Sequence, residues 1–245
     1  MKFHPTEEGR FATAGKDHLA LCDYDGGKKI TKKMGQGKVT SQCAAAWIHD
    51  PKYSNDLITG GADGMLYHWT GNKINGKGIS NNKGPVQSCA ARPDETHGEI
   101  VLAGGNDKTL TVYKFTGKLE KMWSISVDAA PRSVDLYQGV ILLGLKNGSI
   151  AELEMTADGK AEPNVVMTSH CDGEVWAMDI VNFEDGSMRL LTAADDNRIL
   201  AYDPVERKVL CEGKVSAGKT KKKKGKAKGG FKGGASTQSS QPPEG

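Results

Sequence analysis

The residues best suited to chemistry lie near the end of the chain, where residues 213–220 read GKVSAGKT. A glycine, four residues and Gly-Lys-Thr is the pattern of a loop that holds nucleotide phosphates. Such a loop needs a helix directly after it, because the helix N-terminus completes the phosphate site. Here the chain continues KKKKGKAKGG, whose like charges and glycines disfavour a helix. We therefore expect no nucleotide and no other cofactor.

Ionisable residues elsewhere do not form a recognisable catalytic or metal-binding set. Residues 23–27, DYDGG, begin like a calcium loop, but the twelfth position is Met34 instead of the glutamate that calcium requires. Asp195 and Asp196 are adjacent, and adjacent positions of an extended strand point apart. The six histidines lack metal-binding spacing, and no Gly-x-Ser-x-Gly elbow is present. The sequence predicts a protein that is not an enzyme and binds no metal.

The cysteines are odd in number and include no Cys-x-x-Cys pair. Most lie in apolar segments, so we interpret them as small core residues in a reducing compartment; a zinc site and a disulfide framework are the alternatives. The five positions are Cys22, Cys43, Cys89, Cys171 and Cys211.

The composition changes abruptly at residue 216. Residues 216–245 contain one aromatic side chain and no aliphatic one larger than alanine, so they are predicted to be a disordered tail following a domain of residues 1–215. From Gly218 the tail has eight lysines and one glutamate, a net charge of +7. Since the net charge of the whole chain is +3, the domain carries a net charge of about −4. Nucleic acid, an anionic membrane and an acidic protein surface such as tubulin's tails are candidate partners, and a purely solubilising role is the alternative. The lysines concerned are Lys219, Lys221, Lys222, Lys223, Lys224, Lys226, Lys228 and Lys232.

The domain itself is built from a repeat. Similar sequences recur at residues 10–23, 57–69, 100–113, 140–153 and 189–203. In each copy an apolar run ends in small residues, which are followed by a tight turn. The turn residues Asp17, Asp63, Asp107, Asn147 and Asp196 are 46, 44, 40 and 49 positions apart. Runs such as VILLGL do not alternate with polar residues, which indicates strands covered on both faces. Asp-Gly and Asn-Gly turns favour hairpins, so each copy is predicted to be an antiparallel, up-and-down sheet.

In period and turn chemistry these copies resemble the blades of WD-type β-propellers. The resemblance implies a buried hydrogen-bonded set in each blade, formed by the turn Asp, a strand Thr, a strand aromatic residue and a His at the blade entrance. The first and fourth copies depart from this pattern, with Cys22 or Asp23 and Leu153 at the aromatic position. The residues assigned to the set are Thr13, Asp17, Thr59, Asp63, Trp69, Asp107, Tyr113, His170, Trp176, Thr192, Asp196 and Tyr202.

Residues 131–153 and 169–180 resemble a particular family, the echinoderm microtubule-associated protein-like proteins. Arg132-Ser133-Val134, then Gly144, Gly148 and Ile150, then His170 and Glu174-Val175-Trp176 with Met178, match that family's repeat, while Ala177 replaces its glycine. The family's coiled coil and hydrophobic propeller-entry motif have no counterpart in this sequence.

The family resemblance implies a noncatalytic, structural propeller that binds tubulin, microtubules and other cytoskeletal or axonemal proteins in the cytoplasm or cilium. The alternative is a WD-repeat scaffold of a nuclear or ribonucleoprotein complex whose basic tail binds nucleic acid. Because the sequence opens inside a blade, we expect a truncated first blade and further blades from an N-terminal region or another chain; closure of a small propeller by the five copies is the alternative. We expect no membrane partner.

Overall fold

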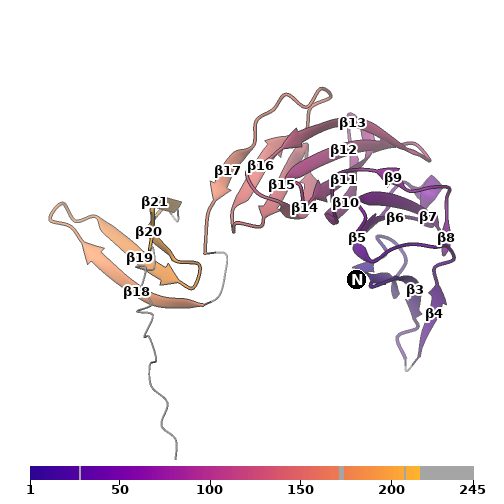
Figure 1. Ribbon diagram of the computed structural model, residues 1–245, viewed down its shortest axis with the longest axis horizontal. Helices are drawn as coiled ribbons and strands as arrows, with labels where there is room; N and C mark the ends of the chain where they lie inside the picture. Colours follow the sequence, from indigo (N-terminus) through magenta and orange to yellow (C-terminus); the bar gives the residue numbers. More distant parts are fainter. Residues whose placement is uncertain (28, 171–173, 207, 216–245) are drawn as a thin grey trace, which may run out of the picture. The chain divides into compact units, whose positions relative to one another are not determined.

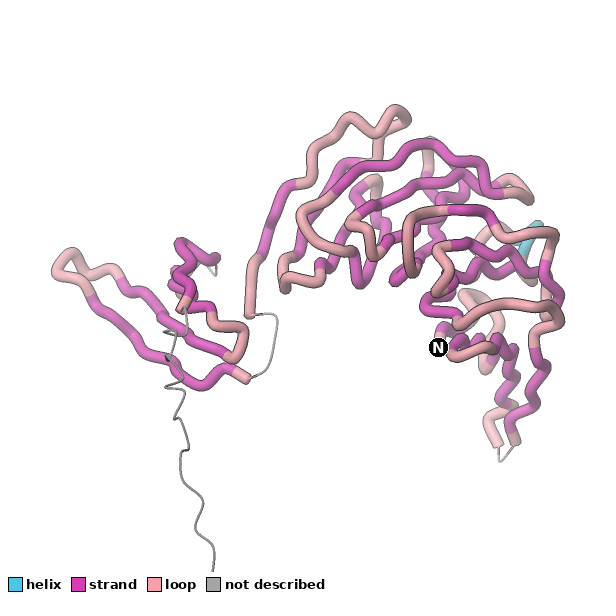
Figure 2. Tube along the Cα trace, viewed as in Figure 1, coloured by secondary structure: helices cyan, strands magenta, loops and turns pink. Residues whose placement is uncertain are grey.

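A computed structural model of the chain describes residues 1–27, 29–170, 174–206 and 208–215, which belong to one compact unit, Met1–Val215. These residues form strands joined by turns and loops, with a single 3₁₀ turn, η1 (Pro51–Tyr53), as the helical segment among them (Figure 2). None of them forms a helix long and apolar enough to span a lipid bilayer. The predicted all-β class is confirmed.

Five antiparallel sheets follow one another along the chain (Figure 1). The first contains β1 (Lys2–Phe3), β2 (Arg10–Gly15), β3 (His18–Tyr24) and β4 (Ile30–Met34). The second contains β5 (Gln42–Trp47), β6 (Asp56–Gly61), β7 (Met65–Thr70) and β8 (Lys73–Ile74), with β9 (Ile79–Ser80) also paired to β7. The third contains β10 (Val86–Asp94), β11 (Gly98–Gly105), β12 (Thr109–Phe115) and β13 (Leu119–Ser126).

The fourth sheet contains β14 (Pro131–Tyr137), β15 (Val140–Leu145), β16 (Ile150–Glu154) and β17 (Asn164–Met167). The fifth contains β18 (Val175–Asn182), β19 (Met188–Ala194), β20 (Arg198–Asp203) and β21 (Lys208–Lys214). Strand order follows chain order in every sheet, apart from β9, so the predicted up-and-down blades are confirmed. The innermost strand of the first sheet, β1, is two residues long.

Three apolar clusters join the first four sheets in pairs. Leu19 of β3 packs in one cluster with Trp47 and Trp69 of the second sheet. Ile58 of the second sheet lies in the next cluster with Val101 of β11, and the third joins the third and fourth sheets. Burying both faces of β11 in this way accounts for its uninterrupted apolar run.

Small residues allow these sheets to approach closely. A Cβ atom built on Gly60 would lie 2.6 Å from Cγ1 of Val86 in the next sheet, and one built on Gly104 would lie 2.7 Å from Cβ of Pro131. A side chain at either position would overlap the neighbouring innermost strand. The glycines that end β6 and β11 therefore set the spacing between sheets.

Coverage on both faces does not extend to the fourth and fifth sheets. Leu143 of β15 is fully buried against the third sheet, but Leu142, which points to the opposite face, is 42% exposed. In β18, Met178 and Ile180 are 71% and 56% exposed. The prediction of two covered faces is therefore wrong for β15, because cluster contacts reach this strand from one side only.

Candidate functional site

The most completely buried polar set lies in the second sheet. Trp69 Nε1 donates to Thr59 Oγ1 over 2.9 Å, and Thr59 Oγ1 donates to Gln42 Oε1 over 2.5 Å. Gln42 thus makes the contact with the strand threonine that the blade resemblance expects of a histidine. Asp63 does not join this series of hydrogen bonds. It accepts instead from the hydroxyl of Tyr67 and, over 3.1 Å, from the Met65 amide.

In the fifth sheet, several residues assigned to the blade set lie close together. His170 Nδ1 lies 3.0 Å from Oδ1 of Asp196, and His170 Nε2 lies 2.9 Å from Oγ1 of Thr192. Tyr202 lines a cavity of ≈ 550 Å³ together with His170 and Thr192. The structure therefore brings His170, Thr192, Asp196 and Tyr202 together, whereas the side chain of Trp176 lies outside the described part of the chain.

The third sheet uses different partners, since Ala103 stands where the strand threonine would be. Asp107 accepts from the Lys83 amide over 3.0 Å and from Thr109 Oγ1 over 2.6 Å. Burial acts to raise the pKa of Asp107, but these hydrogen bonds outweigh it, so the pKa lies below its ordinary value. Tyr113 donates its hydroxyl to Asn81 Oδ1 over 2.9 Å, and burial raises its pKa to about 12.

In the first sheet the predicted pair of Asp17 and Thr13 does not form. Asp17 instead accepts a 3.3 Å hydrogen bond from Ser41, which precedes the innermost strand of the second sheet. The physical reason is exposure: Asp17 projects from its turn toward the neighbouring loop, and Thr13 lies within β2 opposite Ala20. The assigned residues thus hold turns and strand ends together, and their bonds differ from sheet to sheet.

A second polar set, which the sequence reasoning missed, crosses from sheet to sheet. Arg92 Nη1 lies 3.2 Å from His49 Nε2, and Arg92 Nη2 donates to Asp135 Oδ2 over 3.0 Å. Successive members of this set are 43 positions apart, and each lies two residues from the end of an innermost strand: His49 after β5, and Arg92 and Asp135 inside β10 and β14. Because this spacing is close to the repeat period, the sequence repeat could have predicted that these three residues occupy equivalent positions in successive sheets.

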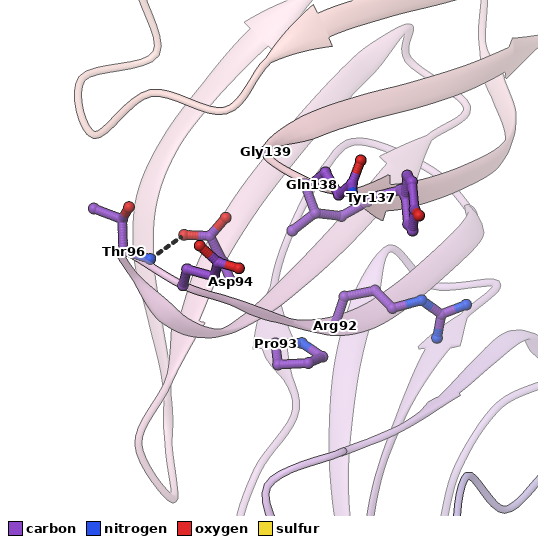
Figure 3. Close-up of a pocket in the computed structure, with 9 residues that line it drawn as sticks. Arg92, Pro93, Asp94, Thr96, Tyr137, Gln138 and Gly139 are labelled. Atoms are coloured by element: carbon purple, nitrogen blue, oxygen red, sulfur yellow. Dashed lines mark hydrogen bonds between the residues drawn. The ribbon is translucent and has the colours of Figure 1, made fainter.

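A groove of ≈ 780 Å³ opens beside Arg92, between the hairpin turns after β10 and β14. Figure 3 shows Arg92, Pro93 and Asp94 on one side and Tyr137, Gln138 and Gly139 on the other. We call it the Arg92 groove. Asp94 is held by the amides of Thr96 and His97, at 3.0 and 2.8 Å, and by the His97 ring. Tyr137 is 69% exposed, which leaves an aromatic face available to a partner.

The chemistry that these sites offer is recognition. Among the described residues no group of three or more His, Cys, Asp or Glu side chains could hold a metal ion. Cys22, Cys43, Cys89 and Cys211 are free thiols. The predicted tail lysines, Lys219 to Lys232, and Cys171 lie outside the described residues. Hydrogen-bonding groups and an exposed aromatic ring beside a groove are suited to binding a peptide segment.

No family model matches the sequence. The ciliary WD repeat-containing protein ctxp80 of Euplotoides octocarinatus is 31% identical over 207 residues, which cover 80% of this chain and 25% of that protein. The 77 kDa echinoderm microtubule-associated protein of Strongylocentrotus purpuratus is 22% identical over 89% of this chain and 31% of its own length. Human echinoderm microtubule-associated protein-like 1 is 26% identical over 83% of this chain and 24% of its own. The chain thus spans between 24% and 31% of the length of these relatives.

Proposed function

Starting from the premise that this chain is a WD-repeat protein of the echinoderm microtubule-associated protein-like family, we propose that it is a noncatalytic, protein-binding platform on cytoplasmic or ciliary microtubules. Its partners are tubulin and other cytoskeletal or axonemal proteins, and its place is the cytoskeleton or the axoneme. The observation that carries the proposal is the similarity to microtubule-associated and ciliary WD-repeat proteins over most of the chain.

The structure is compatible with a binding role. Each turn network fixes the ends of a sheet, and the Arg92 groove presents Tyr137 on a rigid strand end. Apolar side chains of the fourth and fifth sheets are exposed, which favours the presence of further blades that cover them. These blades would come from another part of a longer protein or from a second chain. Residues 1–215 form the platform in this proposal, and the lysines of residues 216–245 add attraction to the acidic tails of tubulin.

Co-sedimentation with microtubules tests the proposal. The intact chain is compared with a variant in which the eight tail lysines, Lys219 to Lys232, are replaced by glutamine, on microtubules with and without the tubulin tails. We expect the intact chain to pellet with microtubules, and the variant to pellet less at low salt because its electrostatic attraction is lost. If neither protein pellets, the proposal fails. Salt-dependent RNA binding by the intact chain, absent in the variant with the eight tail glutamines, would instead favour the nuclear or ribonucleoprotein scaffold.

A further inference from the structure

The innermost strands share a backbone irregularity at one position. Pairing is interrupted between Gln42 and Ala44, between Val86 and Ser88, and between Pro131 and Ser133, so each strand has one extra residue there. A β-bulge of this kind redirects the side chain of the extra residue. The three bulge residues are Cys43, Gln87 and Arg132.

These three side chains line one pocket of ≈ 210 Å³, which we call the bulge pocket. Lys2 of β1 also lines it, with Ser88 and Ser133 and several alanine and cysteine side chains. Two cationic side chains therefore contribute to the lining, and no carboxylate is among the described residues that form it. Asp63, whose charge acts on Cys43, is already hydrogen-bonded by Tyr67 and Met65.

Arg132 is only partly used by the protein. Its Nη1 donates to Gln87 Oε1 over 2.5 Å, so this bond joins two of the bulge residues that line the pocket. The salt bridges of the described residues include neither Arg132 nor Lys2. A guanidinium group has five N–H donors in a planar fork, and the fork matches a carboxylate in a bidentate geometry.

Exposed lysines lie at the same end of the sheets as the bulge residues. In an up-and-down sheet, the turn between the second and third strands lies at the end where the innermost strand begins. Exposed lysines occupy these turns in three sheets, Lys16, Lys108 and Lys146, and Lys83 lies in the loop before β10. The turn aspartates Asp17, Asp63 and Asp107 keep their charge at the same end, but the four lysines together with Lys2 and Arg132 outnumber them. This end is therefore attractive to anions.

We propose that the bulge pocket captures one carboxylate side chain of an acidic peptide segment, and that the surrounding lysines attract its neighbouring acidic residues. A pocket of ≈ 210 Å³ admits a single side chain. A guanidinium fork also pairs with phosphate. A nucleic acid carries each phosphate between two sugars, which a pocket that admits a single side chain does not accommodate, so the two ligands place different demands on Arg132. The assignment does not depend on the proposed microtubule role.

Fluorescence anisotropy with a labelled octaglutamate peptide tests the proposal. All proteins carry the eight tail glutamines, so that the tail does not bind the probe. We expect Arg132→Lys, which keeps the charge but loses the fork, to weaken peptide binding by about tenfold or more. Lys118→Ala, an exposed lysine at the opposite end of the third sheet, serves as the matched control and should bind normally. Equal binding by the Arg132→Lys variant, or no binding by the parent protein, would overturn the proposal.

Two further measurements identify the ligand. A single-stranded DNA octamer should bind the Arg132→Lys variant as well as it binds the parent; a loss of DNA affinity equal to the peptide loss would assign the pocket to general anions and contradict the proposal. Because Cys43 lines the pocket, bound octaglutamate should slow its alkylation, and an octaglutamine peptide should not. Alkylation that is unaffected by octaglutamate would place the peptide elsewhere. An unchanged urea midpoint establishes that Arg132→Lys is folded.

Discussion

The indole Nε1 of Trp69 donates a 2.9 Å hydrogen bond to the hydroxyl of Thr59, and both side chains are completely removed from solvent. Thr59→Val preserves shape but leaves the Trp69 indole N–H and the Gln42 carbonyl oxygen without their partner. An unsatisfied buried group costs about 1–3 kcal/mol, so we expect the free energy of unfolding to fall by about that amount. Urea unfolding followed by tryptophan fluorescence measures the change.

Thr31→Val, on the exposed strand β4, is the control for the Thr59 experiment and should change stability by less than about 0.5 kcal/mol. Trp69→Phe combined with Thr59→Val should cost less than the sum of the single changes, because both remove the same hydrogen bond. Additive costs would show that the two residues do not interact.

The repeat and its turns could be predicted from sequence because they are local. Asp63-Gly64 and Asn147-Gly148 mark hairpins without any knowledge of the rest of the fold. Gln42 could not be assigned in the same way, since it lies 17 residues before Thr59, whereas His170 lies 22 residues before Thr192. The two hairpins span the same distance, from Gln42 to Gly61 and from Val175 to Ala194, so the five extra residues lie before β18: Gln42 begins β5, whereas His170 precedes its strand.

The exposure of Leu142 and Met178 could not be predicted either. Their apolar runs are the same as those of fully covered strands, and coverage depends on what packs against the next sheet. The Arg92 groove and the bulge pocket are likewise products of tertiary contact, because each combines residues from at least two sheets. Spacing alone relates Arg92 to His49 and Asp135, but their polar contacts follow from the stacking of sheets.

Gly104→Ala tests the close approach of the third and fourth sheets. The added Cβ would lie 2.7 Å from Cβ of Pro131 and 2.4 Å from the Ser88 hydroxyl, so strands β10 and β14 must move. Overpacking of this kind typically costs about 1–3 kcal/mol, which the urea midpoint should report. Gly213→Ala is the matched control, since its nearest neighbours are 3.9 Å away. Equal midpoints for the two variants would contradict the packing role.

The carboxylate of Asp107 makes the free energy of unfolding depend on pH. Burial opposes its ionisation, but hydrogen bonds from Thr109, Lys83 and Asn82 lower the pKa below the ordinary 3.8. A folded-state pKa below the unfolded one gives stability that is present above the unfolded pKa and is lost as the pH falls through the folded pKa. Asp107→Asn should therefore destabilise the protein at pH 7, and the difference should shrink below pH 3.8. A difference that stays constant with pH would exclude this role of the carboxylate.

The cysteines should differ in reactivity, because the thiolate is the nucleophile. Burial raises the pKa of Cys89 to about 12, against smaller lowering effects from Lys2 and from a hydrogen bond involving the Gly60 backbone. Burial also raises the pKa of Cys22, and both side chains are inaccessible. A higher pKa leaves less thiolate at pH 8, so neither should react with a disulfide reagent until the protein unfolds.

Cys211, which is exposed, should react in the folded protein. Cys43 is also exposed as a residue, but its sulfur is partly covered by neighbouring atoms. This partial burial and the nearby Asp63 charge raise the pKa of Cys43, so it should react more slowly than an ordinary thiol at the same pH. The experiment uses a Cys171→Ser background and identifies the modified residues by mass spectrometry. Modification of Cys89 as fast as Cys211 before unfolding would show that the second and third sheets separate readily, because Cys89 lies in the cluster that joins them.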